Sequence, residues 1–182
     1  HIADVSAYVR EDSALDLEAE MRGTSVYLVD QVLPMLPQKL SNGICSLNPQ
    51  EERLALSVVM DVDYNGVVQN NEIFPSVIKT TYRLTYDEVN QMYAKDEVVR
   101  EKYVAAWPML EEMKNLQEVL FHKRLLRGAL DFDFPESKVI LDEQGMPVEI
   151  KCFMRGKAER VIEEFMLCAN ETVAERYYWL EV

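Results

Sequence analysis

Alternation between apolar and polar residues predicts two β-hairpins in this chain. The first covers residues 53–83 and turns around Asn65-Gly66, a pair that is typical of two-residue hairpin turns. The second joins residues 138–143 to residues 147–154 through a turn at Gly145. Because a hairpin pairs neighbouring strands in opposite directions, we expect a largely antiparallel sheet.

The first fifty residues predict a strand, a helix and a loop. Residues 1–9 are rich in β-branched and aromatic side chains, which favours a strand. Ser13 is a suitable N-cap for a helix that we expect to run to about Leu28. Two prolines then interrupt regular structure, so residues 34–50 are expected to form a long loop.

Capping residues and apolar spacings predict helices in the rest of the chain. Thr85 and Glu88 form a capping box for a short helix, and residues 97–106 continue as helix. Pro108 suits the first turn of a longer helix, whose expected buried residues are Leu110, Met113, Leu116, Leu120 and Leu126. The last helix covers about residues 157–178, and its expected buried residues are Ile162, Phe165, Met166, Ala169 and Val173.

This order of elements predicts an α+β fold with a largely antiparallel sheet, hairpins and flanking helices. A length of 182 residues, with 48% hydrophobic and 28% charged side chains, suits one domain over residues 1–182. The sequence has no apolar run of the roughly 18 residues that a membrane span needs. Cys45, Cys152 and Cys168 are too scattered for a disulfide framework, so we interpret them as reduced thiols of a cytoplasmic protein.

The net charge of −13 excludes a surface that is basic throughout, as many nucleic-acid-binding domains have. Two segments nevertheless gather cations. They are Lys123, Arg124 and Arg127 in the first, and Lys151, Arg155, Lys157 and Arg160 in the second. Either they complement helix ends and solvate a face, which we favour, or they form a track for phosphates.

Residues 61–72 match the calcium loop of an EF-hand position by position. The flanking residues alternate as strands do, whereas that loop needs a helix on each side. We therefore interpret the segment as the polar turn of the hairpin and keep a calcium sensor as an alternative. His1 and His122 form no metal-ligand pair, and no glycine-rich phosphate loop is present.

The last helix places two glutamates differently. With Ile162 at the centre of the buried face, Glu163 lies about 100° around the helix and Glu164 about 200° around it. We expect Glu164 to face solvent and Glu163 to lie on the boundary, where a carboxylate could bond a ligand. Tyr27, Tyr86 and Phe132 lie near ends of elements, and such aromatic residues either join a core or stack on unpaired bases.

Seven segments of the sequence, taken in order, carry a resemblance to one protein family. They are HIADVSAYV (1–9), LDLEA (15–19), RGTSVYL (22–28), LPMLPQKLSNGICSLNPQEERLA (33–55), YRLTYDEV (82–89), RGALDFDFPE (127–136) and AERVIEEFMLCANETVAE (158–175). In this order they resemble the catalytic RNB domain of the ribonuclease R and ribonuclease II family, and the bacterial ribonuclease R branch is the closer match.

The resemblance implies a processive 3′→5′ exoribonuclease that hydrolyses single-stranded RNA with Mg²⁺. It also implies that the aspartates that hold the metal precede His1 and that a catalytic arginine and a further glutamate follow Val182. We therefore expect a piece of a longer enzyme, with no catalytic residue in residues 1–182 and no activity alone. Cold-shock and S1 domains of the same parent chain are the implied partners, with no membrane.

The RNA-binding residues that the resemblance implies are Tyr27, Tyr86, Phe132 and Glu163. Tyr27 and Phe132 match aromatic residues that stack on RNA, whereas Tyr86 and Glu163 match residues near the ribose of the terminal nucleotide. A phenol and a carboxylate there can bond the 2′-hydroxyl and distinguish RNA from DNA. The alternative is an acidic protein-interaction module without catalysis.

Overall fold

A computed structural model describes residues 1–132 and 136–181 of the chain. Most strands follow one another in pairs and the helices between residues 86 and 126 are consecutive, while the described strand pairings are antiparallel apart from one isolated parallel bridge. This arrangement confirms the α+β class. The chain divides into two compact units. The first contains His1–Ser57, Ile73–Arg83 and Ser137–Cys152, and the second contains Val58–Glu72, Leu84–Glu136 and Phe153–Val182.

The start of the first unit is less extended than the sequence predicts. Strand β1 (Ile2–Ala3) pairs antiparallel with β4 (Glu52–Val62), with Ile2 opposite Leu56. A 3₁₀ turn, η1 (Val5–Ala7), follows at once, because the Asp4 carboxylate accepts the Ala7 N–H at 3.2 Å. The expected strand over residues 1–9 is therefore wrong beyond its first residues.

The first helix begins where expected and ends early. In α1 (Ala14–Arg22) the N–H of Asp16 donates to Ser13 Oγ, which confirms the cap. Gly23 then adopts φ +68° and ends the helix, so the expected extension to Leu28 is wrong. Beyond it, β2 (Val26–Tyr27) pairs with β3 (Val32–Leu33).

The segment expected to be a long loop contains a short π-helix, η2 (Lys39–Ile44), so that expectation is only partly right. After it, β4 and β5 (Val68–Lys79) form the first predicted hairpin. At its turn the Asp63 carboxylate accepts the N–H groups of Asn65 and Val67. The structure thus confirms a hairpin turn in the segment that matches a calcium loop.

Strands β6 (Glu136–Leu141) and β7 (Pro147–Phe153) form the second predicted hairpin. Gly145 has φ +78°, and its N–H donates to the carbonyl of Asp142 at 3.0 Å. Positive φ costs glycine little, which explains a glycine at this turn.

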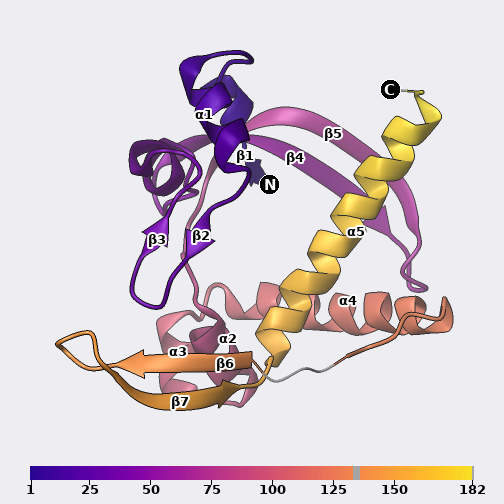
Figure 1. The fold of residues 1–182 in the computed structure, drawn as a ribbon. Coiled ribbons are helices and arrows are strands. Elements are labelled where there is room, and N and C mark those ends of the chain that lie inside the picture. Colours follow the sequence, from indigo (N-terminus) through magenta and orange to yellow (C-terminus); the bar gives the residue numbers. More distant parts are fainter. Residues whose placement is uncertain (133–135, 182) are drawn as a thin grey trace. The chain divides into compact units, whose positions relative to one another are not determined.

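The second unit is built mainly from α2 (Tyr86–Tyr93), α3 (Glu97–Lys102), α4 (Trp107–Leu126) and α5 (Lys157–Trp179). Helix α5 packs against α4 and α2, and α2 packs against α3 (Figure 1). One core cluster of these helices and their caps contains the buried residues Val89, Met92, Tyr103, Ala106, Leu110 and Ala158. None of the helices in the described residues is long and apolar enough to cross a membrane.

The buried faces of the two longest helices differ from the expected ones. Leu126 is 77% exposed and Met166 is 59% exposed, although both were expected to be buried. On α5 the buried residues are instead Ala158, Val161, Glu164 and Thr172. The buried face is therefore rotated by about one residue, and Glu164, expected in solvent, is only 4% exposed.

Candidate nucleic-acid interface

The N-terminus of α5 is held against α2 by side-chain hydrogen bonds. Asn90 of α2 accepts the N–H of Ala158 at 2.9 Å and donates to Glu159 Oε2 at 2.9 Å. The same carboxylate oxygen accepts the N–H of Gly156, the N-cap, at 3.0 Å. These bonds satisfy N–H groups that have no partner within a helix and fix the direction of α5. They position the following turn, which carries Glu163.

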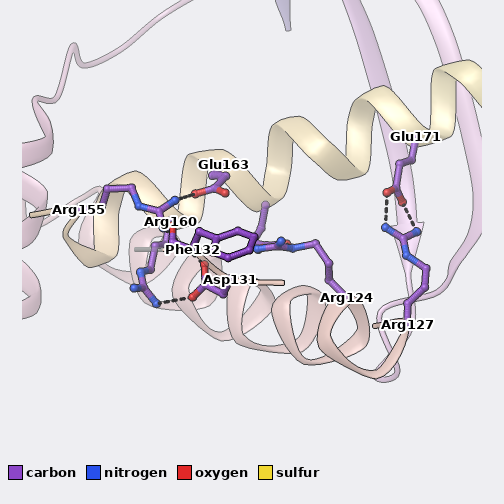
Figure 2. Close-up of polar contacts among 9 residues, drawn as sticks. Arg124, Arg127, Asp131, Phe132, Arg155, Arg160, Glu163 and Glu171 are labelled. Carbon is purple, nitrogen blue, oxygen red and sulfur yellow. Dashed lines mark hydrogen bonds and ion pairs between the residues drawn. The ribbon is translucent and has the colours of Figure 1, made fainter. Parts of the chain in front are cut away.

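Arg155, directly before the N-cap, connects the start of α5 to the loop that follows α4. Its Nη1 donates to Glu163 Oε2 at 2.9 Å, and its Nη2 donates to the Phe132 carbonyl at 3.0 Å. Nη2 also lies 3.5 Å from Asp131 Oδ1 (Figure 2). One guanidinium therefore links two of the four predicted RNA-binding residues, Phe132 and Glu163.

The loop after α4 has a second contact with α5. Arg160 Nη1 lies 3.8 Å from Asp131 Oδ2, an ion pair that Figure 2 also shows. Gly128 has φ +95°, and the N–H of Ala129 donates to the Arg124 carbonyl as the helix ends. The loop turns away from α4 at Gly128, and its described end, at Asp131 and Phe132, meets α5 through arginines. Residues 133–135 of the block 127–136 lie outside the described residues.

Tyr86 lies in the first turn of α2 and is 48% exposed. Thr85 and Glu88 form the predicted capping box, so the prediction of this helix start is confirmed. Hydrogen bonds from Lys102, Tyr103 and Thr85 lower the pKa of Glu88 to about 2. The first turn of α2, which contains Tyr86, is therefore connected to α3 and its C-cap by hydrogen bonds of Glu88.

An apolar pocket of about 170 Å³ adjoins Tyr86 in the second unit. Its walls include Val89 of α2 and Met109 of α4, and also Val161 and Ile162 of α5. Ile162 directly precedes Glu163 in the chain. Tyr86 thus lies in the same unit as Phe132 and Glu163, beside the helix that carries Glu163.

Tyr27 belongs to β2 in the first unit and is 77% exposed. An exposed aromatic ring on a short strand is available for stacking. The structure therefore places the four predicted residues as follows. Phe132 and Glu163 are joined by Arg155, Tyr86 belongs to the same unit, and Tyr27 belongs to the other unit.

The cations of the first basic segment are engaged by the protein itself. Lys123 donates to the Gly66 carbonyl at 2.8 Å. Arg127 forms two hydrogen bonds with Glu171, and this contact raises the pKa of Arg127 and lowers the pKa of Glu171 (Figure 2). These pairings favour the interpretation as charge at a helix end and not as a phosphate track.

Arg124 and Glu164 form a buried, two-nitrogen ion pair between α4 and α5. Arg124 Nη2 lies 2.6 Å from Glu164 Oε1, and its Nε lies 3.0 Å from the same oxygen. Hydrogen bonding of the guanidinium to the Glu164 carboxylate raises the pKa of Arg124. Their side chains are 16% and 4% exposed, so the pair replaces water as the partner of both charges.

Sequence reasoning missed the role of two arginines, Arg124 and Arg155. Their partners lie 40 and 8 positions away, and Arg155 precedes the helix that carries Glu163, so no helical spacing relates them. The described residues contain no group of three or more His, Cys, Asp or Glu side chains that could hold a metal ion. All three cysteines are free, in agreement with reduced thiols.

The profile of the RNB domain family matches residues 1–182. The chain belongs to the RNB domain family. Ribonuclease R 1 of Lactococcus lactis subsp. lactis (strain IL1403) is 55% identical over 177 residues, which are 97% of this chain and 22% of that protein. The sequence resemblance to this family is thereby confirmed.

Solved structures agree with this assignment. Mycoplasma genitalium RNase R in complex with ribose methylated single-stranded RNA has a TM-score of 0.88 and 33% identity, over 99% of this chain and 28% of that one. Yeast Ssd1, described as a pseudonuclease, has a TM-score of 0.72 and 20% identity, over 97% of this chain and 21% of that one, which shows the fold alone. This RNB chain spans less than a third of each of these relatives.

Proposed function

We propose that this chain is the central part of the catalytic domain of a cytoplasmic 3′→5′ exoribonuclease that degrades single-stranded RNA. The observation that carries the proposal is the 55% identity with a ribonuclease R over nearly the whole chain. The likeness to an RNase R solved with single-stranded RNA supports the choice of substrate. Residues 1–182 contribute RNA-binding side chains to that domain.

Four residues carry the expected RNA contacts: Tyr27 in the first unit, and Tyr86, Phe132 and Glu163 in the second. Exposed rings of Tyr27 and Phe132 stack on unpaired bases, each stack contributing about 1–3 kcal/mol irrespective of sequence. Tyr86 and Glu163 bond the terminal ribose. Arg155 engages Oε2 of Glu163, and Oε1 has no hydrogen-bond partner among the described residues, so that oxygen can accept a bond from a 2′-hydroxyl.

Hydrolysis in this proposal depends on Mg²⁺, which activates water and neutralises charge on the scissile phosphate. The donor groups of the described residues do not form a site for this ion. We propose that the metal ligands come from other parts of a longer protein, together with cold-shock and S1 domains that add affinity for RNA.

RNA binding by the chain tests the proposal directly. We expect a 5′-labelled oligoadenylate with a free 3′ end to bind. Tyr27→Ala and Phe132→Ala should each weaken binding about tenfold, as expected for the loss of one stacked base. Tyr64→Ala is the matched control, because this tyrosine lies at the hairpin turn and is fully exposed. Fluorescence anisotropy measures all four proteins, and equal affinities would contradict the stacking assignment.

Discrimination of RNA from DNA tests the ribose contacts. Glu163→Gln and Tyr86→Phe remove a charge and a hydroxyl with little change of volume. We expect each to reduce the preference for RNA over the same DNA sequence, measured by the same anisotropy titration. An unchanged preference would contradict the assignment of these two residues to the ribose.

The alternative is an acidic interaction module, because the pseudonuclease Ssd1 shows that this fold does not by itself imply catalysis. An exonuclease assay on poly(A) with Mg²⁺ compares this chain with a longer protein that contains it. We expect turnover by the longer protein only. Turnover by the chain alone would show that the proposed location of the metal ligands is wrong. The absence of turnover by both proteins would favour the acidic interaction module.

A further inference from the structure

We propose that Arg155 is a positioning residue that fixes the Phe132 ring and the Glu163 carboxylate relative to each other for RNA binding. The inference rests on the proposed function and adds a residue to that same site. It starts from the observation that one guanidinium contacts the Phe132 carbonyl and Glu163 Oε2 together. No contact of Arg155 itself with RNA is required.

Arginine suits this role because its donors are arranged in a rigid plane. Nη1 points to Glu163 at 2.9 Å, whereas Nη2 points to the Phe132 carbonyl at 3.0 Å and toward Asp131 at 3.5 Å. The rigid guanidinium thus fixes the distance between its two acceptors. A lysine ammonium is a single charged group on a flexible side chain and cannot fix this distance.

The two groups that Arg155 connects need such a link for different reasons. Glu163 lies on a helix whose start is fixed by Asn90, so its backbone is already positioned. Phe132 lies outside the helices and strands, in the segment that follows α4. Because the contact is to its main-chain carbonyl, Arg155 positions the backbone of Phe132 and leaves the ring able to stack.

Burial and charge make the link stronger than an ordinary surface ion pair. The side chains of Arg155 and Asp131 are 24% and 27% exposed, and that of Glu163 is 37% exposed. Arg160 brings a second positive charge toward Asp131, so Arg155 and Arg160 both pair with carboxylates of the described residues. Partial exclusion of water strengthens these contacts relative to fully exposed pairs.

The first test detects positioning in the absence of RNA. The chain contains six phenylalanines, and uniform 4-fluorophenylalanine labelling gives ¹⁹F signals, among which Phe132 is assigned by Phe132→Leu. We expect Arg155→Ala to move the Phe132 signal toward the position of a flexible residue and to leave the others in place. Arg127→Ala, which breaks an exposed two-bond pair elsewhere on α4 and α5, is the matched control and should not move it.

The second test measures coupling in RNA binding. We expect Phe132→Ala to weaken RNA binding about tenfold in the wild-type protein. In the Arg155→Ala background the same substitution should weaken binding less than about threefold, because the effects of substitutions within one network of contacts are not additive. Arg155→Lys should fall between wild type and Arg155→Ala. If Arg155→Lys matches wild type, charge alone suffices and the positioning role is overturned.

The outcomes separate this inference from the proposed function. If wild-type protein binds RNA and Phe132→Ala weakens it equally in both backgrounds, the role of Arg155 is overturned while the proposed function stands. An unmoved Phe132 signal in Arg155→Ala also overturns it. If wild-type protein does not bind RNA, the proposed function itself fails, and the inference fails with it.

Discussion

Arg124 and Arg127 stand about one turn apart at the end of α4, and each offers two nitrogen atoms to a glutamate of α5. The geometry of the two pairs is similar, but their surroundings differ. Arg124 and Glu164 are nearly buried, whereas Arg127 and Glu171 are 58% and 51% exposed. A charge that loses its partner is costly only where water cannot replace that partner.

This contrast predicts unequal losses of stability. Glu164→Ala leaves the Arg124 guanidinium partly buried without a counter-charge, so we expect the free energy of unfolding to fall by about 3 kcal/mol. Glu171→Ala removes an exposed pair and should cost less than about 1 kcal/mol. Urea unfolding of both variants and the wild type measures the difference, and equal losses would contradict the role of burial.

A helical wheel with Ile162 at the centre of the buried face places Glu164 about 200° around the helix and therefore in solvent. The arginine that accompanies it is 40 positions away on another helix. Glu163, on the boundary as expected, is one residue from this buried position. The burial of Glu164 therefore depends on a partner in another helix, which the spacing of apolar residues along α5 cannot reveal.

At the scale of elements, the junction of α2 and α5 depends on a glycine. A Cβ on Gly156 would lie 2.3 Å from Asn90 Nδ2, so the amide that caps α5 would have to move. The φ angle of Gly156 is −85°, which any residue adopts, and the restriction is therefore one of space. Close packing against Asn90 therefore requires a glycine at this position.

Gly156→Ala should accordingly destabilise the protein by about 1–3 kcal/mol, as overpacking does. Gly43→Ala is the control, because a Cβ there meets nothing within 4 Å and its φ is not positive. We expect that change to be neutral or to stabilise by up to about 1 kcal/mol. Thermal unfolding followed by circular dichroism distinguishes them, and a neutral Gly156→Ala would contradict the packing argument.

The start of α2 predicts a dependence of stability on pH. The pKa of Glu88 is about 2 in the folded protein and 4.5 as an ordinary value, so the unfolded chain binds more protons between these limits. The stabilisation by this carboxylate is complete above about pH 5 and is lost as the pH falls toward 2. Glu88→Gln keeps the cap but not the charge.

We expect Glu88→Gln to lower the free energy of unfolding by roughly 1 kcal/mol at pH 7, in line with a partly exposed ion pair. The difference from wild type should shrink as the pH falls from 5 to 3. Glu112→Gln, at an exposed position of α4, is the control. Urea unfolding at several pH values measures both, and a difference that does not change with pH would show that the charge is unimportant.

Sequence patterns predicted the elements that local interactions define. Both hairpins have their turns where Asn65-Gly66 and Gly145 stand, and both predicted caps, at Ser13 and Thr85, are present. The errors are at ends that depend on a neighbouring element or on a single backbone angle. Gly23 stopped α1 early, and Asp4 turned the first strand into a 3₁₀ turn.

At the scale of the whole chain, the charge of −13 and the engaged arginines predict how RNA binding responds to salt. Each phosphate contact on single-stranded nucleic acid contributes about 0.7 to the slope of log affinity against log salt. With stacking as the main contribution, we expect a slope no steeper than about −2.

Binding of a labelled oligoadenylate between 50 and 300 mM KCl measures this slope. A phosphate track that used both basic segments would give a slope near −5 and would contradict the interpretation as helix-end charge. Arg127→Ala is a useful comparison, because Glu171 already engages this cation. We expect the variant to have the wild-type slope.

The sequence alone determined the α+β class, the two hairpins, the capped helix starts and membership in the RNB family. These depend on residues within a few positions of one another, or on long blocks read as a whole. Only the tertiary structure decided that Glu164 is buried by Arg124 and that Arg155 links Phe132 to Glu163. Those contacts join segments 40 and 23 positions apart, and packing, not local preference, selects such partners.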